Sequence, residues 1–203
     1  MSNRRIAVLI SGRGSNLQAL IDAVAAGQLD ATIALVLSNR ADAQGLERAR
    51  AAHIPAMTIP HREFPTRDAF ETAVVAELRA RDVSLVCLAG FMRLLGPTYL
   101  ATFGERTLNV HPSLLPAFPG VDAQRQALDH GVKVAGATVH FVTNQLDAGP
   151  IVMQDAVRVH DNDTADALAA RILEVEHRIY PQAVASVLDG GWTIEGRTYR
   201  KSR

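Results

Sequence analysis

The chain has 203 residues, of which 48% are hydrophobic, enough for one domain whose core needs neither metals nor disulfides. Lysine plus arginine equals aspartate plus glutamate at 21 each, so the charge balance argues against nucleic acid or another polyanion as a partner. One cysteine excludes a disulfide framework, and no segment resembles a signal peptide or reaches membrane-spanning length, so we expect a cytoplasmic protein without a membrane partner.

The first half of the sequence alternates apolar runs with patterns of helical period. Arg5–Ile10 is a continuous run rich in aliphatic residues, typical of a parallel strand buried on both faces. In chain order the patterns predict strands at 5–10, 32–37, 56–59 and 83–89, and helices at 17–26, 45–52 and 67–81. Because the links are short, the alternation favours right-handed crossovers and a parallel sheet.

The second half is mixed. It predicts strands at 108–110, 134–142 and 151–159, a helix at 123–128 and a last helix capped by Asp163 or Thr164. We expect Pro181 to kink that helix or to end it near Tyr180, and the terminal basic clusters at 4–5 and 197–203 to be solvated. The fold class is therefore α/β: a single domain over 1–203, with a Rossmann-like parallel sheet, helices on both faces and a partly antiparallel C-terminal half.

A glycine-containing loop, Ser11-Gly12-Arg13-Gly14-Ser15-Asn16, joins the first strand to the first helix. Glycines let the backbone approach an anion, and the free amides of a helix N-terminus point at it; Ser15 or Asn16 can also cap the helix. Leu17 replaces the third glycine of the dinucleotide fingerprint, and Ser38-Asn39 offers no acidic residue for a ribose diol. The loop predicts a site for one terminal phosphate; a tight turn without a ligand is the alternative.

Three polar residues suit acyl transfer to an amine. Asn109 and His111 project from the same side of a strand end, and Asp147 lies in a later turn. Asn109 can donate to an oxyanion, His111 can move a proton, and Asp147 can orient the ring. The structural alternatives are a capping or core histidine and a turn-forming aspartate. Ser113 lacks the Gly-x-Ser-x-Gly elbow of a serine hydrolase.

Other polar residues have weaker patterns. His140 lies within a strand and is equally suited to the core or to the site. Glu176 flanks the apolar stripe of the last helix, where spacing favours an edge residue over a ligand for a cationic group. Cys87 is expected in the core, and no metal site is expected because no ligand pair has a third ligand nearby. The remaining histidines that fall near turns are given no role: His53, His61, His130 and His160.

Six segments together resemble the phosphoribosylglycinamide formyltransferases, folate-dependent enzymes of purine synthesis. The resemblance runs from about residue 6 to 190 and is carried by Ser11 to Asn16, Leu88-Ala89-Gly90-Phe91-Met92-Arg93, Asn109-Val110-His111-Pro112-Ser113-Leu114-Leu115-Pro116, Val139-His140-Phe141-Val142, Leu146-Asp147-Ala148-Gly149-Pro150 and Glu176-His177-Arg178-Ile179-Tyr180-Pro181. It implies formyl transfer from 10-formyltetrahydrofolate to glycinamide ribonucleotide, directly and without a metal.

The resemblance also assigns residues. It makes Asn109, His111 and Asp147 catalytic; it gives the substrate phosphate to Gly14, Ser15 and Asn16, and the glycinamide end to Glu176. It places the folate donor against Arg67, Met92, Arg93, Leu94, Leu95, Asn109, His140, Val142 and Asp147. Residues of about 1–100 would form a phosphate-binding half and about 101–203 a catalytic and folate-binding half, in a monomer or homodimer. Where the family often has histidines after Phe118-Pro119-Gly120, this chain has Asp122 and Gln124.

Three competing functions remain. A formyltetrahydrofolate hydrolase shares the Asn-x-His and Leu-Asp signals but normally adds an N-terminal regulatory domain. A methionyl-tRNA formyltransferase needs a further domain and a basic surface. An inactive folate- or nucleotide-binding homologue would keep the glycine loop and lose a member of the trio, whereas Asn109, His111 and Asp147 are all present.

Overall fold

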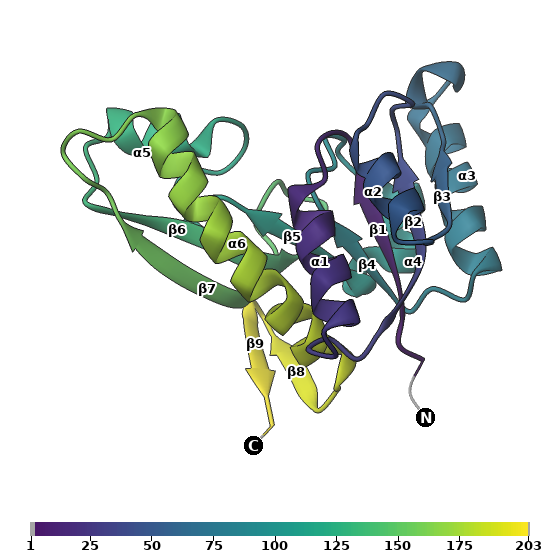
Figure 1. Cartoon of the computed structure of the whole chain (residues 1–203). Helices are drawn as coiled ribbons and strands as arrows, with labels where there is room; N and C mark the ends of the chain where they lie inside the picture. Colours follow the sequence, from purple (N-terminus) through teal and green to yellow (C-terminus); the bar gives the residue numbers. More distant parts are fainter. Residues whose placement is uncertain (1–2, 203) are drawn as a thin grey trace.

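A computed structural model describes residues 3–202 of the protein. Within this range one nine-stranded sheet has the order β3-β2-β1-β4-β5-β6-β7-β9-β8 (Figure 1). The strands are β1 Arg5–Ile10, β2 Thr32–Ser38, β3 Ala56–Thr58, β4 Leu85–Leu88, β5 Thr107–His111, β6 Val134–Phe141, β7 Ile151–Arg158, β8 Trp192–Glu195 and β9 Thr198–Lys201. The helices are α1 Ser15–Ala25, α2 Gly45–Ala51, α3 Arg67–Ala80, α4 Pro97–Phe103, α5 Ala123–Asp129 and α6 Ala165–Leu188, with short 3₁₀ turns η1 His61–Glu63 and η2 Gly104–Arg106.

The sheet is parallel from β3 to β5 and antiparallel from β5 to β7. The chain runs outward from β1 through β2 to β3, then returns to β4 on the other side of β1. Loops that leave the carboxyl ends of β1 and β4 therefore diverge, which opens a crevice where α/β folds hold ligands. The α/β class with a mixed second half is confirmed.

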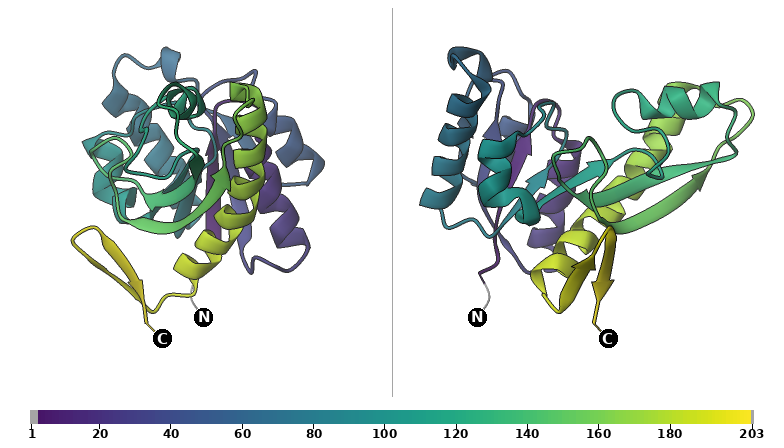
Figure 2. Two further views of the ribbon diagram at one scale, coloured as in Figure 1. Left: turned by 90° about the vertical axis from the view of Figure 1, so that its left-hand side faces the viewer. Right: turned by 180° about the vertical axis from the view of Figure 1, so that it is seen from behind.

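Helices cover both faces of the sheet, as predicted (Figure 2). Alternate residues of β1 divide between two cores: Ile6, Val8 and Ile10 pack with α1, α2 and α6, whereas Ala7 and Leu9 pack with α3 and α4. All five side chains are fully buried, which explains why the run shows no polar alternation. Packing in the two cores holds the carboxyl ends of the strands in place, where the glycine loop and the polar residues of β5 lie.

The long helix α6 begins after Thr164, whose Oγ1 accepts a hydrogen bond of 3.1 Å from the amide of Ala167. It continues through Pro181 to Leu188, so the expectation that it ends near Tyr180 was wrong. Proline has no amide proton for the carbonyl of His177, but Pro181 and the turns beyond it are buried against the sheet. The packing of this part of α6 against the sheet thus offsets the hydrogen bond that Pro181 cannot donate.

The C-terminal basic residues are not a free end. Thr198–Lys201 forms β9, which pairs with β7 and with β8, and its Tyr199 packs against Trp192 and Phe141 at centroid distances of 5.7 and 6.1 Å. At the other end, Arg4 lies 3.2 Å from carboxylate oxygens of both Asp30 and Asp189. The described basic side chains of the two clusters are nevertheless mostly solvated, as predicted: Arg5, Arg197, Arg200 and Lys201 are exposed, and Arg4 is half-buried.

The remaining expected elements are present, with ends within two residues of those predicted, whereas α4, β8 and β9 were not predicted. In residues 3–202 none of the helices combines the length and the apolarity that crossing a membrane requires.

Candidate functional site

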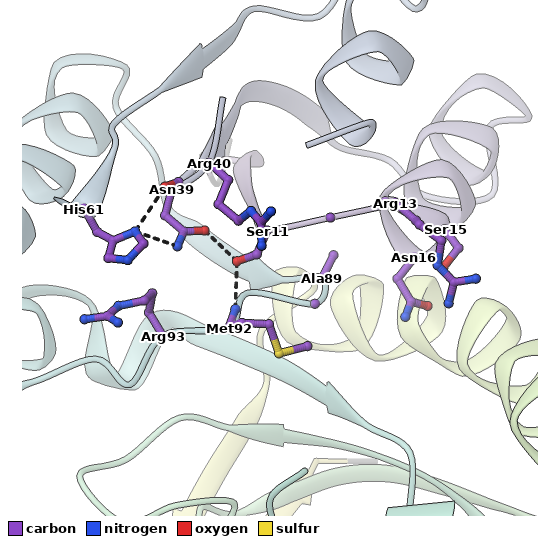
Figure 3. Close-up of a pocket in the computed structure, with 13 residues that line it drawn as sticks. Ser11, Arg13, Ser15, Asn16, Asn39, Arg40, His61, Ala89, Met92 and Arg93 are labelled. Carbon is purple, nitrogen blue, oxygen red and sulfur yellow. Dashed lines mark hydrogen bonds between the residues drawn. The ribbon is translucent and has the colours of Figure 1, made fainter. Parts of the chain in front are cut away.

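A cavity of about 430 Å³ lies at the carboxyl ends of β1, β2 and β4 (Figure 3). The predicted glycine loop forms one side of the cavity. The other sides are formed by residues that come directly after β2, β3 and β4 in the chain. It is lined by Ser11, Gly12, Arg13, Gly14, Ser15, Asn16, Asn39, Arg40, His61, Ala89, Gly90, Met92 and Arg93. The cavity therefore occupies the crevice that the strand order opens between β1 and β4.

The backbone of the glycine loop is held close to α2. Gly14 has φ +73° and is the N-cap of α1, where a Cβ would lie 2.7 Å from the Cα of Gly45. No side chain caps α1, and Ser15 and Asn16 lie inside its first turn, so the prediction that one of them caps the helix was wrong. The first-turn amides of α1 have no intrahelical acceptors, which suits an anion at this end of the cavity.

Asn16 and Glu176 meet between α1 and α6. The Asn16 Nδ2 donates to Glu176 Oε2 at 2.6 Å, and both residues are buried. Burial raises the pKa of Glu176 to about 7, and the hydrogen bond from Asn16 opposes that rise only in part. The spacing-based interpretation of Glu176 as an edge residue was wrong: its carboxyl group is a buried acceptor beside the glycine loop.

The second polar cluster lies where β5 and β6 pair. Asn109 and His140 are cross-strand partners, and Asn109 Nδ2 lies 3.2 Å from His140 Nε2. Asp147, in the turn after β6, places Oδ2 3.5 Å from His111 Nδ1 and Oδ1 3.6 Å from His140 Nε2. The three residues predicted from separate motifs thus converge, and His140, for which core and site were both open, is buried among them.

Backbone groups define which ring nitrogens carry hydrogen. His140 Nδ1 lies 2.9 Å from the carbonyl of Phe141, which can only accept, so Nε2 has a lone pair for the Asn109 amide. His111 Nε2 likewise lies 2.9 Å from the carbonyl of Phe118 and therefore carries hydrogen. With Nε2 engaged in this way, only the imidazolium form of His111 can also donate from Nδ1 to Asp147.

Asp147 is held as a carboxylate. Burial opposes ionisation, but the proximity of His140, the hydrogen bond from the Gly120 amide (2.8 Å) and the charge of His111 together outweigh it and keep the pKa of Asp147 below 3.8. The turn itself is compact: Asp147 has φ +49°, and a Cβ on Gly149 would lie 1.8 Å from the carbonyl of Phe141. The geometry therefore gives a fixed negative charge beside His111.

The segment predicted to hold the donor follows β4. Met92 and Leu94 are 71% and 65% exposed, whereas Leu95 is buried and Val142 packs on the core shared with α3 and α4. Exposed apolar side chains next to a polar crevice favour an amphipathic ligand. Arg67 begins α3, and its Nε lies 3.5 Å from Oε1 of Glu71.

Sequence reasoning missed three buried or half-buried groups at these loops. The carboxylate of Glu71 accepts from the amides of Gly96 (2.6 Å) and Tyr99 (3.1 Å) and so caps α4. Glu71 is three, four and seven residues from Val74, Val75 and Leu78, a spacing that places it on the apolar face of α3 and could have marked it in the sequence. Asn39 and His61 hydrogen-bond to each other beside the cavity, although His61 was given no role.

Among residues 3–202 no group of three His, Cys, Asp or Glu side chains is placed to hold a metal ion.

Comparison with known proteins places this geometry in context. The Formyl transferase family matches residues 4–184. The chain is 45% identical over 185 residues to the phosphoribosylglycinamide formyltransferase of Escherichia coli, covering 91% of this chain and 87% of that protein. Its structure superposes on glycinamide ribonucleotide transformylase 1 from Symbiobacterium toebii with a TM-score of 0.95, at 54% identity over 97% and 93% of the two chains. A formyltetrahydrofolate deformylase from Pseudomonas syringae gives 0.88 at 28% identity, over 97% of this chain and 65% of that one.

Proposed function

The chain belongs to the formyl transferase family, and from this premise we propose that it transfers a formyl group from 10-formyltetrahydrofolate to the amine of glycinamide ribonucleotide. The products are formylglycinamide ribonucleotide and tetrahydrofolate, in de novo purine biosynthesis. The observation that carries the proposal is the convergence of Asn109, His111 and Asp147 beside a cavity with a phosphate-type loop.

The trio performs the transfer by electrostatics and proton movement. When the amine attacks the formyl carbon, negative charge forms on the formyl oxygen and positive charge on the amine nitrogen. Asn109 keeps one amide hydrogen on His140 and has a second for the oxyanion, while His111 stabilises the same charge and relays a proton. The bond from the formyl carbon to N10 of the donor then breaks as N10 receives the amine's proton. Asp147 orients His111 and balances its charge.

The two ends of the substrate match two features at the contact between α1 and α6. Gly14, Ser15 and Asn16 hold the phosphate at the amides of α1, and Glu176 receives the glycinamide end as a carboxylate. In this arrangement Asn16 also links the two ends, since it contacts Glu176 directly. Residues of about 1–100 thus bind phosphate and about 101–203 supply catalysis and the folate pocket.

The folate donor occupies the surface formed by Arg67, Met92 to Leu95, His140, Val142, Asn109 and Asp147. Its pterin is the amphipathic ligand that the exposed Met92 and Leu94 favour. We place this activity in the cytoplasm, in a monomer or homodimer that needs neither nucleic acid nor a metal; the equal numbers of acidic and basic residues and the single cysteine support this setting.

Hydrolysis of the donor is the second candidate, because the Pseudomonas syringae deformylase shares the fold. The higher identity to transformylases and the buried Glu176, an acceptor for an amine or hydroxyl group, favour transfer.

The test is release of tetrahydrofolate from 10-formyltetrahydrofolate with glycinamide ribonucleotide, with its dephosphorylated form, or with water alone. We expect release only with an acceptor, and a much higher KM without the phosphate. Equal release in all three mixtures would favour the hydrolase.

A further inference from the structure

The start of α2 lies against the glycine loop and binds two of its carbonyl groups. The amide of Gly45 donates to the carbonyl of Gly12 at 3.0 Å. Nε of Arg48 donates to the carbonyl of Arg13 at 2.9 Å. A Cβ on Gly14 would lie 2.7 Å from the Cα of Gly45 and 3.6 Å from the Cδ of Arg48, so both residues pack directly on the loop. Neither is among the residues that line the cavity, and the two carbonyl groups are therefore turned away from it.

The direction of these carbonyl groups also sets the direction of the amides that follow them. In a trans peptide, such as these two, the C=O and the next N–H point to opposite sides. With the Arg13 carbonyl held toward α2, the amide of Gly14 faces the other side of the loop, where the cavity lies. The Gly12 carbonyl orients the amide of Arg13 in the same way. In residues 3–202 neither amide has a backbone acceptor, so both are available to a ligand.

Asn16 gives independent evidence that a ligand belongs at this end of the cavity. It lines the cavity and is only 8% exposed (Figure 3). Its Nδ2 donates to Glu176, but its Oδ1 has no hydrogen-bond partner in the part of the chain that the structure describes. A buried acceptor without a partner costs free energy, and a hydroxyl group beside a bound phosphate would supply the missing donor. The free amides and this oxygen together suit a phosphate ester of a hydroxylated molecule.

Arg48 is held in its orientation from a second side. Its Nη1 donates to Oε1 of Gln18 at 3.2 Å, and Nε2 of Gln18 donates to Oδ1 of Asp22 at 2.8 Å. Gln18 and Asp22 lie one turn apart on α1, the helix that begins at the loop. Although its side chain is exposed, Arg48 thus joins α2, the loop and α1. The formyl transfer proposed above gives no part to Arg48.

We propose that Arg48 is a positioning residue for the phosphate end of the substrate: by holding the carbonyl of Arg13 toward α2, it aims the amide of Gly14 at the phosphate. This role rests on the proposed function. Without the hydrogen bond from Arg48, the peptide between Arg13 and Gly14 is free to turn its carbonyl oxygen toward the anion. The anion then loses one donor and meets a negative dipole end. Arg48 acts through the loop backbone and touches neither reactant.

Two substitutions of Arg48 separate its hydrogen bond from its charge. Glutamine has its amide nitrogen at the position along the side chain where arginine has Nε, so Arg48→Gln keeps a donor for the Arg13 carbonyl and loses the charge. Arg48→Met keeps the length of the stem and loses both the donor and the charge. The matched control is Arg50→Met, which removes an exposed cation paired with Glu47 on the same helix.

The kinetic test compares glycinamide ribonucleotide with its dephosphorylated form as acceptors. We expect Arg48→Met to raise the KM of the phosphorylated acceptor about three- to tenfold, as expected for loss of one hydrogen bond. The kcat, and the kcat/KM of the dephosphorylated acceptor, should not change. Arg48→Gln and Arg50→Met should stay near the values of the unchanged protein. An equal rise in Arg48→Met and Arg48→Gln, or an equal effect on both acceptors, would overturn the proposal.

A binding test separates the role of Arg48 from the proposed function. Ribose 5-phosphate, which carries no glycinamide, is added to the ¹⁵N-labelled protein, with ribose as the control ligand. We expect the amide proton of Gly14 to move downfield with ribose 5-phosphate alone, and Arg48→Met to bind it more weakly than Arg48→Gln. This result supports the role of Arg48 even if no formyl transfer is found. A Gly14 amide that ribose 5-phosphate leaves unmoved in the unchanged protein, or equal binding by the two variants, contradicts it.

Discussion

At the scale of single residues, the carboxylate of Asp147 faces His111, the proposed proton relay. Its two oxygens face His111 and His140, and the Gly120 amide fixes its orientation. A negative charge in this place can balance the positive charge of a histidine that supports an oxyanion.

We therefore expect Asp147→Asn, which keeps the shape and removes the charge, to lower kcat about a hundredfold or more. His111→Ala should lose at least as much. Steady-state formyl transfer measures both, with exposed Asp161→Asn as the control of unchanged rate. Near-normal turnover in both site variants would remove the proposed mechanism.

Glu176 gives a prediction in pH. Since burial raises its pKa to about 7, only part of the protein has the carboxylate form near neutrality. If that form receives the glycinamide end, kcat/KM for glycinamide ribonucleotide rises as pH increases through about 7, and Glu176→Gln lowers it and abolishes this rise. A rise of the same size in the variant would show that another group is responsible.

The carboxyl group of Glu176 also makes the free energy of unfolding depend on pH. The folded protein binds a proton at Glu176 more tightly than the unfolded chain, whose value is 4.5, so this residue lowers the free energy of unfolding as pH rises from 4.5 to about 7. The full effect is about 3 kcal/mol. Denaturation should show Glu176→Gln gaining stability relative to the unchanged protein between pH 5 and pH 8.

Residue spacing was sufficient to single out Asn109, His111 and Asp147 as candidates, because alternation along β5 and the turn at 146–150 are local features, whereas their proposed roles come from the family resemblance. Burial is not local. Glu176 stands at the border of a helical stripe in sequence, and only the packing of α1 against α6 makes it a buried acceptor. His61 has no distinguishing neighbours in sequence, since its partner Asn39 is 22 residues away.

At the scale of elements, α4 shows why some helices escape sequence analysis. It has seven residues and begins at Gly96-Pro97, a pattern that resembles a loop. Its N-terminal amides are satisfied by Glu71 from α3, a contact that no local pattern contains. The segment Met92 to Leu95, which we propose contacts the donor, leads directly into this helix.

We expect Glu71→Ala to lower the free energy of unfolding by about 2 kcal/mol or more, because two buried amides lose a charged acceptor. Glu71→Gln keeps one acceptor and should lose less. Chemical denaturation measures both, with Glu77→Ala, which removes a half-buried carboxylate paired with Arg81 on the same helix, as the control. Equal stability of Glu71→Ala and the control would mean that the cap contributes nothing.

At the scale of the whole molecule, the strand order determines where function lies. Hydrophobic runs and short links predicted the parallel half and the mixed half, whereas the crevice between β1 and β4 follows from a strand order that only the structure gives. The β8–β9 extension was not predicted, because it is held by stacking of Trp192 and Tyr199 on Phe141 rather than by its own pattern. Two polar clusters, far apart in sequence, lie at the same end of the sheet because β1, β4 and β5 are neighbouring parallel strands.

The most direct test of the central claim follows the carbon of the formyl group. The protein is given 10-formyltetrahydrofolate labelled at that carbon, with and without glycinamide ribonucleotide. If the polar clusters transfer the group directly, the label enters formylglycinamide ribonucleotide in step with release of tetrahydrofolate, and the donor stays intact without acceptor. Label released as formate at the same rate in both mixtures would contradict the proposed function.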